Sequence, residues 1–274
     1  MWLGCGVPNE LPDRLVANID VDKPNLARIY DYFLGGACNF APDRELADRL
    51  VEVIPEAERA AQQNRAFLGR AVRFCAERGI RQFLDLGSGI PTVGNVHEIA
   101  QRVVPECRVV YVDNDPVAVA HGQLMLEADH RVDVVLADMV DVDMVLGSEP
   151  ARRLLDFQAP LAVLMVGVLH WIPDAEDPWR AAARYVDAMA SGSYLVVSHG
   201  ALVETQRSLD GWRMMTESGN PSGGRPREQV EAFLAGTDLV EPGLVWIPQW
   251  RPEPGLETDN PELTFLWGAV GHKP

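Results

Sequence analysis

Residues 80–95 contain the side chains whose types and spacing point most clearly to chemistry. The apolar run 83–86 includes Asp85 and leads directly into Gly87-Ser88-Gly89. Glycines in such a turn let the backbone approach a ligand, and the free N–H groups of a following helix attract its polar atoms. The acid two residues before the first glycine would repel a pyrophosphate. It would suit a ligand that carries an ammonium group.

Other nucleotide motifs fit this stretch less well. A dinucleotide fingerprint requires G-x-G-x-x-G, but Thr92 stands where the third glycine belongs. The chain also has no G-x-x-x-x-G-K-[ST] phosphate loop. The alternative is that this strand and glycine turn bind no ligand. Asp-x-Gly-x-Gly favours S-adenosylmethionine, whose methionine end carries an ammonium group.

Acids also follow the next two predicted strands. Asp113 ends the strand predicted at 108–112, where a carboxylate can accept both ribose hydroxyls, and Asn114 lies beside it. The alternative reading, an acid that caps the next helix, fits Asp115 better. Asp138 follows the strand at 132–137 and could accept the adenine amino group, while Met139 could cover the ring. Asp138 as an ordinary loop acid stays open.

Gly167 and His170 follow the apolar run 161–166, which we expect to be a strand buried on both faces. Ligands of open α/β sheets bind at the carboxyl ends of such strands. His170 could therefore take a proton from an acceptor oxygen or nitrogen, although it could equally orient the cofactor or bond a backbone carbonyl. We do not predict a metal site, because Gln101 stands where a second zinc-binding histidine after His97 would be needed.

Two features of the N-terminal helices are candidates for contact with the cofactor. Tyr30 and the adjacent Gly35 and Gly36 could form a lid, since paired glycines permit close approach to a ligand. Tyr30 as plain core is the alternative. Arg65, in the third helix, could pair with the cofactor carboxylate or simply be a solvated helix arginine.

The elements that position these residues follow from hydrophobic periodicity. We predict an α/β fold with a Rossmann-like, seven-stranded, mostly parallel sheet, an antiparallel edge hairpin and an N-terminal helical lobe. The expected organisation is a loose segment at 1–23, a helical lid or lobe at 24–79 and the sheet-containing domain at 80–274. Pro91 is expected in the first turn of a helix reaching 103. The predicted strands are 83–86, 108–112, 132–137, 161–166, 193–198, 240–248 and 263–270.

Composition restricts the partners. The 274 residues include 24 basic and 40 acidic ones, a net charge of −16 that argues against nucleic acid as a partner. The longest apolar stretch, 160–168, is too short to span a membrane, and no signal peptide is evident. We expect four reduced cysteines, a cytoplasmic location and a small-molecule partner, with a homodimer as one possible assembly.

The order of elements resembles the class I S-adenosylmethionine-dependent methyltransferases. More closely, the chain from about 24 to 274 is similar to an actinobacterial S-adenosyl methyltransferase family, formerly a domain of unknown function. The resemblance implies S-adenosylmethionine as cofactor and methyl transfer to an O or N atom, without naming the acceptor. A non-catalytic cofactor-binding protein and a nicotinamide oxidoreductase are the alternatives. The shared runs are 27–36, 64–68, 83–95, 97–98, 110–116, 168–170, 192–195, 198–199 and 240–244.

Overall fold

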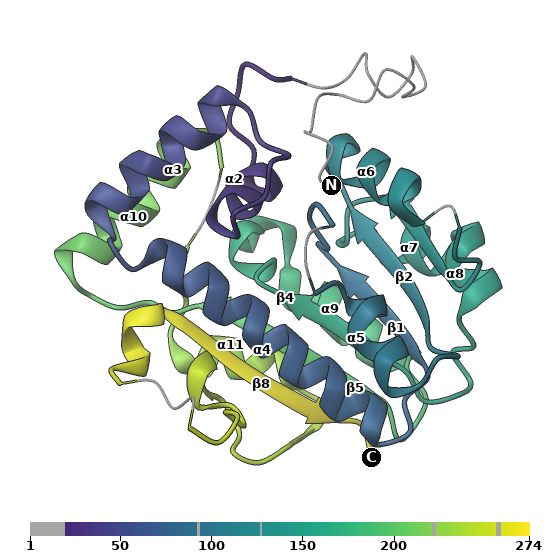
Figure 1. Ribbon diagram of the computed structural model, residues 1–274. Helices are drawn as coiled ribbons and strands as arrows, with labels where there is room; N and C mark the ends of the chain where they lie inside the picture. Colours follow the sequence, from purple (N-terminus) through teal and green to yellow (C-terminus); the bar gives the residue numbers. More distant parts are fainter. Residues whose placement is uncertain (1–19, 92–93, 127, 221–222, 256–258) are drawn as a thin grey trace.

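A central sheet lies between two layers of helices in the computed structural model, which describes residues 20–91, 94–126, 128–220, 223–255 and 259–274 (Figure 1). Most of the loose segment predicted at 1–23 lies outside these residues. The predicted α/β, Rossmann-like class is confirmed. None of the described helices combines the length and apolar character that crossing a membrane requires.

The sheet has eight strands in the order β3-β2-β1-β4-β5-β8-β6, and β7 pairs with β8. Strands β1 to β5 are parallel, whereas β8 runs antiparallel to β5. Strand β1 has β2 on one side and β4 on the other, so the strand order reverses there, which is where ligands bind in open α/β sheets. The strands are β1 (Gln82–Leu86), β2 (Arg108–Asp113), β3 (Val132–Leu136), β4 (Ala162–Val166), β5 (Tyr194–Gly200), β6 (Asp238–Leu239), β7 (Val245–Trp246) and β8 (Leu266–His272).

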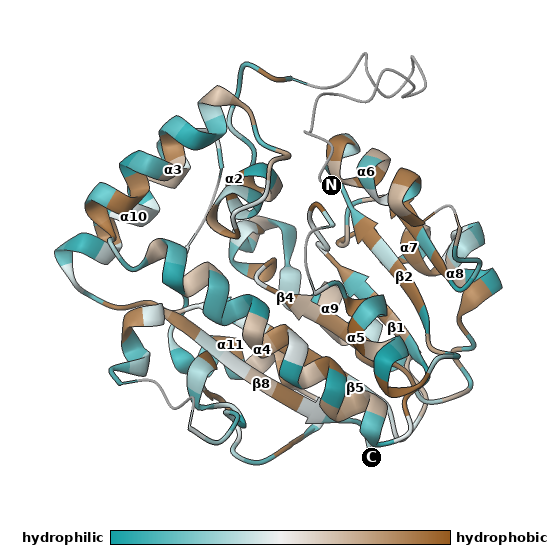
Figure 2. Cartoon of the chain, viewed as in Figure 1, coloured by the Kyte–Doolittle hydropathy of each residue, from teal (hydrophilic) through white to brown (hydrophobic). Residues whose placement is uncertain are grey.

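Each face of the sheet is covered by its own helices. One face packs against α4 (Ala57–Glu77), α5 (Val96–Val103) and α6 (Pro116–Leu126). The opposite face packs against α7 (Val142–Gly147), α8 (Glu149–Leu154), α9 (Pro178–Ala188) and α11 (Arg227–Glu231). Figure 2 shows the hydrophobic colour concentrated on strands such as β1 and β2, as expected for strands buried on both faces.

A third, smaller cluster is formed by α2 (Leu26–Phe33), α3 (Ala41–Val53) and α10 (Gln206–Glu217). The predicted boundary at 24–79 therefore groups helices that pack differently, since α4 belongs to the main core beside the sheet. The domain division stays a prediction. Short 3₁₀ helices complete the chain: η1 (Leu169–Trp171), η2 (Asp174–Glu176), η3 (Ala232–Leu234), η4 (Ile247–Gln249) and η5 (Pro261–Thr264).

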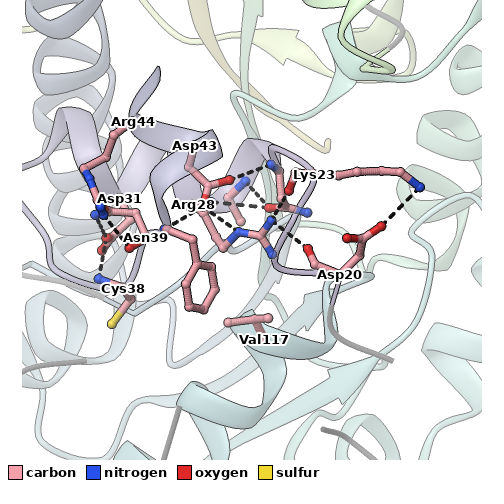
Figure 3. A network of polar contacts seen from close by, with 12 residues as sticks. Asp20, Lys23, Arg28, Asp31, Cys38, Asn39, Asp43, Arg44 and Val117 are labelled. Atoms are coloured by element: carbon pink, nitrogen blue, oxygen red, sulfur yellow. Dashed lines mark hydrogen bonds and ion pairs between the residues drawn. The ribbon is translucent and has the colours of Figure 1, made fainter. Parts of the chain in front are cut away.

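A buried ion pair joins α2 to α3 (Figure 3). The Arg28 Nε–H donates to Asp43 Oδ2 at 2.8 Å, and both side chains are almost fully buried. Asp43 also accepts from the backbone N–H groups of Asn25 and Phe40, the residues that precede the two helices. A buried carboxylate with these three donors is well satisfied, and it fixes the angle between α2 and α3.

Several element boundaries differ from the predictions. Helix α5 begins at Val96 with Asn95 as its N-cap, so Pro91 precedes the helix instead of lying in its first turn. Strand β5 runs through Gly200, which places His199 within the strand. The strand predicted at 240–248 is reduced to the short strand β7, and the short strand β6 lies just before this range.

The expectation of four reduced cysteines is also corrected. Cys75 and Cys107 are free and buried, whereas Cys38 is disulfide-bonded.

Candidate active site

A cavity of about 460 Å³ lies at the carboxyl edge of β1, β2, β3 and β4, beneath α2 and α4. Its volume is within the range of small-molecule sites. Most of the predicted cofactor-binding residues line it: Tyr30, Arg65, Asp85, Gly87, Ser88, Gly89, Asp113, Asn114, Asp138, Met139 and Gly167. Gly35, Gly36 and His170 are not among the lining residues.

Asp85 is a nearly buried acid at the centre of this edge. Strand alternation puts its side chain on the same face as Phe83, toward α4 and Arg65. Burial raises the pKa of Asp85 to about 7, an effect that Arg65 opposes and Asp113 adds to. No hydrogen bond joins the Asp85 carboxylate to another residue in the described part of the chain. A ligand cation would lower this pKa and supply the missing partner.

The glycine turn places backbone against the cavity. Gly87 has φ +69°, and a Cβ there would lie 2.3 Å from Val168 Cγ2, so the position requires glycine. Gly89 has φ +67°, and its N–H donates to Asp113 Oδ2 at 2.7 Å. The turn after β1 is therefore tied directly to the acid after β2, which confirms the predicted turn.

Asp113 ends β2, and Asp138 follows the neighbouring strand β3. The other oxygen of Asp113 accepts the Asp115 N–H at 2.8 Å, and burial raises the Asp113 pKa to about 6 despite these two backbone donors. Carboxylate oxygens have further lone pairs for hydroxyl donors. Asp138 is exposed at the rim and accepts from the Val140 N–H.

Asp115 begins α6 by accepting the N–H of Val117 at 2.9 Å, which is the capping role expected of it. Met139 is buried beside Asp138 in the lining of the cavity.

A polar chain that the sequence did not reveal connects α2, α4 and β5. Asn64 Nδ2 donates to the Tyr30 hydroxyl at 3.1 Å, and the Ser198 hydroxyl donates to Asn64 Oδ1 at 2.6 Å. Tyr30 in turn donates to the carbonyl of Ala61. Asn64 is 3% exposed. The sequence signal that could have revealed these hydrogen bonds is Asn64, an amide on the otherwise apolar face of a helix.

Arg65 and Gly167 lie beside this chain. The Arg65 guanidinium lies 5.7 Å from the centroid of the Tyr30 ring. Gly167 has φ +74°, and a Cβ there would lie 2.9 Å from Asn64 Nδ2. Glycine at 167 therefore allows α4 to approach the end of β4, and both residues face the cavity.

The paired glycines serve the protein's own structure. A Cβ at Gly36 would lie 2.0 Å from Asp31 Oδ1, so this glycine makes room for a buried carboxylate. Asp31 Oδ2 accepts from the Cys38 N–H and from Asn39 Nδ2, contacts that appear in Figure 3. Gly35 is exposed with φ +74° and ends α2. Their contribution to a lid stays a prediction.

His170 lies behind the cavity wall. Its Nδ1 accepts the backbone N–H of Gly200 at 3.2 Å, and its ring contacts the rings of Trp171, Trp212 and His199. Burial, reinforced by His199 and Arg225, holds the His170 pKa well below its ordinary value. The ring is therefore neutral at pH 7, but it does not face the space where an acceptor would lie.

Comparison with known proteins assigns the chain to a family. Residues 12–274 match the family described as S-adenosyl methyltransferase. The chain belongs to this family.

Two solved structures resemble this methyltransferase along nearly its whole length. A candidate methyltransferase from Thermobifida fusca YX is 40% identical, with a TM-score of 0.89 and coverage of 96% of this chain and 98% of the other. A DUF574 family protein from Streptomyces avermitilis MA-4680 is 36% identical, with a TM-score of 0.89 and coverage of 93% and 99%.

A more distant O-methyltransferase family protein from Burkholderia thailandensis shares the fold alone. It is 16% identical with a TM-score of 0.50, and the match covers 84% of this chain and 68% of the other. No curated protein matches the chain.

The protein is an S-adenosylmethionine-dependent methyltransferase. The cavity suits this cofactor, because an acid without a hydrogen-bond partner among the described residues, a glycine turn and a second acid face it from adjacent strands. Neither alternative, a cofactor-binding protein without catalysis or a nicotinamide oxidoreductase, is favoured by any of these comparisons.

Proposed function

We propose that this methyltransferase transfers a methyl group to an oxygen or nitrogen of a small-molecule acceptor in the cavity at the carboxyl edge of the sheet. The observation that carries the proposal is the position of Asp85 and Asp113. They end adjacent parallel strands, and both carboxylates face one cavity. Asp85 would hold the ammonium group, and Asp113 would accept the ribose hydroxyls.

The remaining contacts extend from these two acids. Asp138 would accept the adenine amino group and Met139 would cover the ring, while Arg65 would meet the cofactor carboxylate. Gly87, Ser88 and Gly89 would bring backbone close to the ligand, and Asn114 would lie at the ribose. These assignments follow from which strand end supplies each residue.

The cofactor supplies a sulfonium methyl group, whose transfer to a neutral O or N nucleophile leaves S-adenosylhomocysteine and one proton. The protein's part is to align the acceptor and to exclude water. Tyr30, fixed by its hydrogen bonds to Asn64 and Ala61, covers the cavity from α2 and suits the exclusion of water. His170 supports the cavity wall through Gly200, and a role as general base stays a prediction.

The expected partners fit the charge of the chain. A net charge of −16 opposes binding to nucleic acid or to anionic lipid surfaces, which favours a small-molecule acceptor. A cytoplasmic location and a homodimer stay predictions. Light scattering of the purified chain would measure the oligomeric state.

An acceptor screen tests the proposal. Purified protein is incubated with S-adenosylmethionine and a library of small amines, phenols and alcohols, and S-adenosylhomocysteine is measured by mass spectrometry. We expect product that depends on an acceptor and is lost in Asp113→Ala, which should weaken cofactor affinity by about 1.5–3 kcal/mol for each lost charge-assisted bond. Cofactor binding without turnover on any acceptor would instead support the non-catalytic alternative.

A further inference from the structure

We propose that the methyl acceptor is an apolar molecule that carries an amine, and that it occupies the half of the cavity walled by α2, α3, α10 and the segment after β4. The proposal rests on the proposed function, because it assigns the other half of the cavity to the cofactor. It adds the chemical class of the acceptor.

The walls of this half are apolar. The three helices come from distant parts of the chain and lie together in Figure 1. The side chains that α2, α3 and α10 contribute to the cavity lining are mostly hydrophobic, whereas the ends of β1, β2 and β3 contribute acids. The aliphatic, thioether and phenyl side chains that these helices contribute to the lining are Leu26, Ala27, Ile29, Phe33, Leu50 and Met215.

A glycine on α10 lets this helix pack closely against α3. A Cβ at Gly211 would lie 2.4 Å from Ile54 Cδ1 and 3.6 Å from Leu50 Cδ1, so α10 packs directly on the end of α3. Met215, about one turn further along α10, is 3% exposed and lines the cavity. The wall is thus closely packed, as an apolar binding surface requires.

The segment after β4 continues this wall, since Trp171 packs against the same cluster, and polar contacts hold the segment in place. Trp171 Nε1–H donates to the carbonyl of Gly167 at 2.9 Å, which fixes the indole beside the cavity. The buried Arg225 donates to the carbonyl of Ile172 at 2.8 Å and to Asp174 at 2.7 Å. An acceptor therefore meets a preformed aromatic and aliphatic surface.

The charges around the cavity favour a cation. Arg65 is the one basic side chain among the described lining residues, and it interacts with Asp85. Glu176, exposed in η2, adds a carboxylate in the segment after β4. Asp85, Asp113 and Asp138 serve the cofactor half, so Glu176 is the carboxylate that the segment after β4 offers to the acceptor half. It attracts the ammonium form of an amine and repels a carboxylate or phosphate. The bound ammonium must release a proton to solvent before its nitrogen attacks the methyl group. The acidic lining residues are Asp85, Asp113, Asp115, Asp138 and Glu176.

The test compares three probes that share one apolar body. Protein saturated with S-adenosylhomocysteine is titrated calorimetrically with 2-naphthylmethylamine, 2-naphthylmethanol and 2-naphthoate. We expect the amine to bind most tightly and the carboxylate at least about tenfold more weakly, because like charges in a binding site are strongly unfavourable. Equal or tighter binding of the carboxylate would overturn the proposal.

Two variants and one control variant test where the probe binds. Phe33→Ala should weaken amine binding about tenfold or more with a much smaller effect on S-adenosylhomocysteine affinity, because Phe33 lies on α2 and the acids assigned to the cofactor lie at the strand ends. Leu46→Ala is the matched control, since Leu46 is buried in the same cluster but does not line the cavity. Glu176→Gln, an exposed substitution, should weaken the amine by about two- to fivefold and leave the alcohol unchanged.

The outcomes separate this inference from the proposed function. Binding of S-adenosylhomocysteine with no binding of any probe, or probe binding that Phe33→Ala and Leu46→Ala affect equally, would overturn the acceptor class but not the cofactor site. Failure of S-adenosylhomocysteine itself to bind would overturn the proposed function.

Discussion

Asp85 gives the site a dependence on pH. Its carboxyl has a pKa of about 7 in the free protein, and only the ionised form attracts an ammonium group. The α-amino group of the ligand stays charged below pH 7. We therefore predict that S-adenosylhomocysteine affinity falls as pH decreases from 7 to 5.5, approaching about tenfold per pH unit. Calorimetry across this range measures the effect, and Asp85→Asn should remove most of it.

The same residue limits stability. Its pKa is raised from 3.8 to about 7, so the folded protein holds a proton that the unfolded chain releases. The unfolding free energy contributed by this group therefore decreases as pH rises from about 4 to 7. Asp85→Asn should unfold at a higher temperature than the wild type at pH 8 while binding cofactor more weakly. A variant less stable than wild type at pH 8 would show that Asp85 has a compensating partner.

Two roles are open to His170, general base and structural support, and they predict different effects of its substitution. A general base contributes about 100-fold or more to turnover, whereas a residue that only fixes a strand end affects mainly stability. From its hydrogen bond to Gly200 and its position behind the wall, we expect His170→Ala to lower the unfolding free energy by about 1–3 kcal/mol and turnover by much less than 100-fold. A stable variant whose turnover falls by about 100-fold or more at saturating cofactor would instead support the role as general base.

At the scale of the elements, the end of α2 depends on Gly36. Its backbone allows other residues, but a Cβ would overlap Asp31 Oδ1, which is buried. Gly36→Ala should therefore cost about 1–3 kcal/mol, the usual range for overpacking. Gly35→Ala is the informative companion, because nothing lies near its Cβ and its strain comes only from φ +74°. Chemical denaturation measures both, and no loss in Gly36→Ala would contradict the close contact.

Helix α2 is the element that we expect to respond to the cofactor. It carries Tyr30 and the apolar residues over the cavity, and apart from the Tyr30 hydrogen bonds to α4 it packs mainly in the small cluster outside the main core. Helices with little buried contact open locally, and a ligand that they cover slows this opening. Hydrogen exchange in residues 24–40 should slow with S-adenosylhomocysteine, whereas exchange in β1 should not change. Unchanged exchange in α2 would make it a fixed wall.

Local sequence signals predicted the elements better than their ends. The apolar runs marked β1 to β5 because strands buried on both faces are continuously apolar. Pro91 misled the prediction of α5, because Asn95 and Glu98 form the capping box that actually starts the helix. The predicted strand at 240–248 overlooks the turn signal Pro242-Gly243, which separates the short strands β6 and β7.

At the scale of the whole molecule, the cofactor half of the cavity could be predicted and the acceptor half could not. Asp85 lies near the end of β1, Asp113 ends β2 and Asp138 follows β3, and parallel strands bring their carboxyl ends to one edge. Phe33 and Met215 are far apart in the chain and meet only because α10 packs on α3. No local pattern encodes that packing, and for the same reason the position of His170 behind the wall was missed.

The central claim is that this cavity holds S-adenosylmethionine with Asp85 at the ammonium group and Asp113 at the ribose. A crystal structure of the protein with S-adenosylhomocysteine tests it most directly. We predict that the ligand lies in the cavity, with its amino group within hydrogen-bond distance of the Asp85 carboxylate and its ribose hydroxyls hydrogen-bonded to Asp113. A ligand bound elsewhere, or bound here with its ribose away from Asp113, would contradict it.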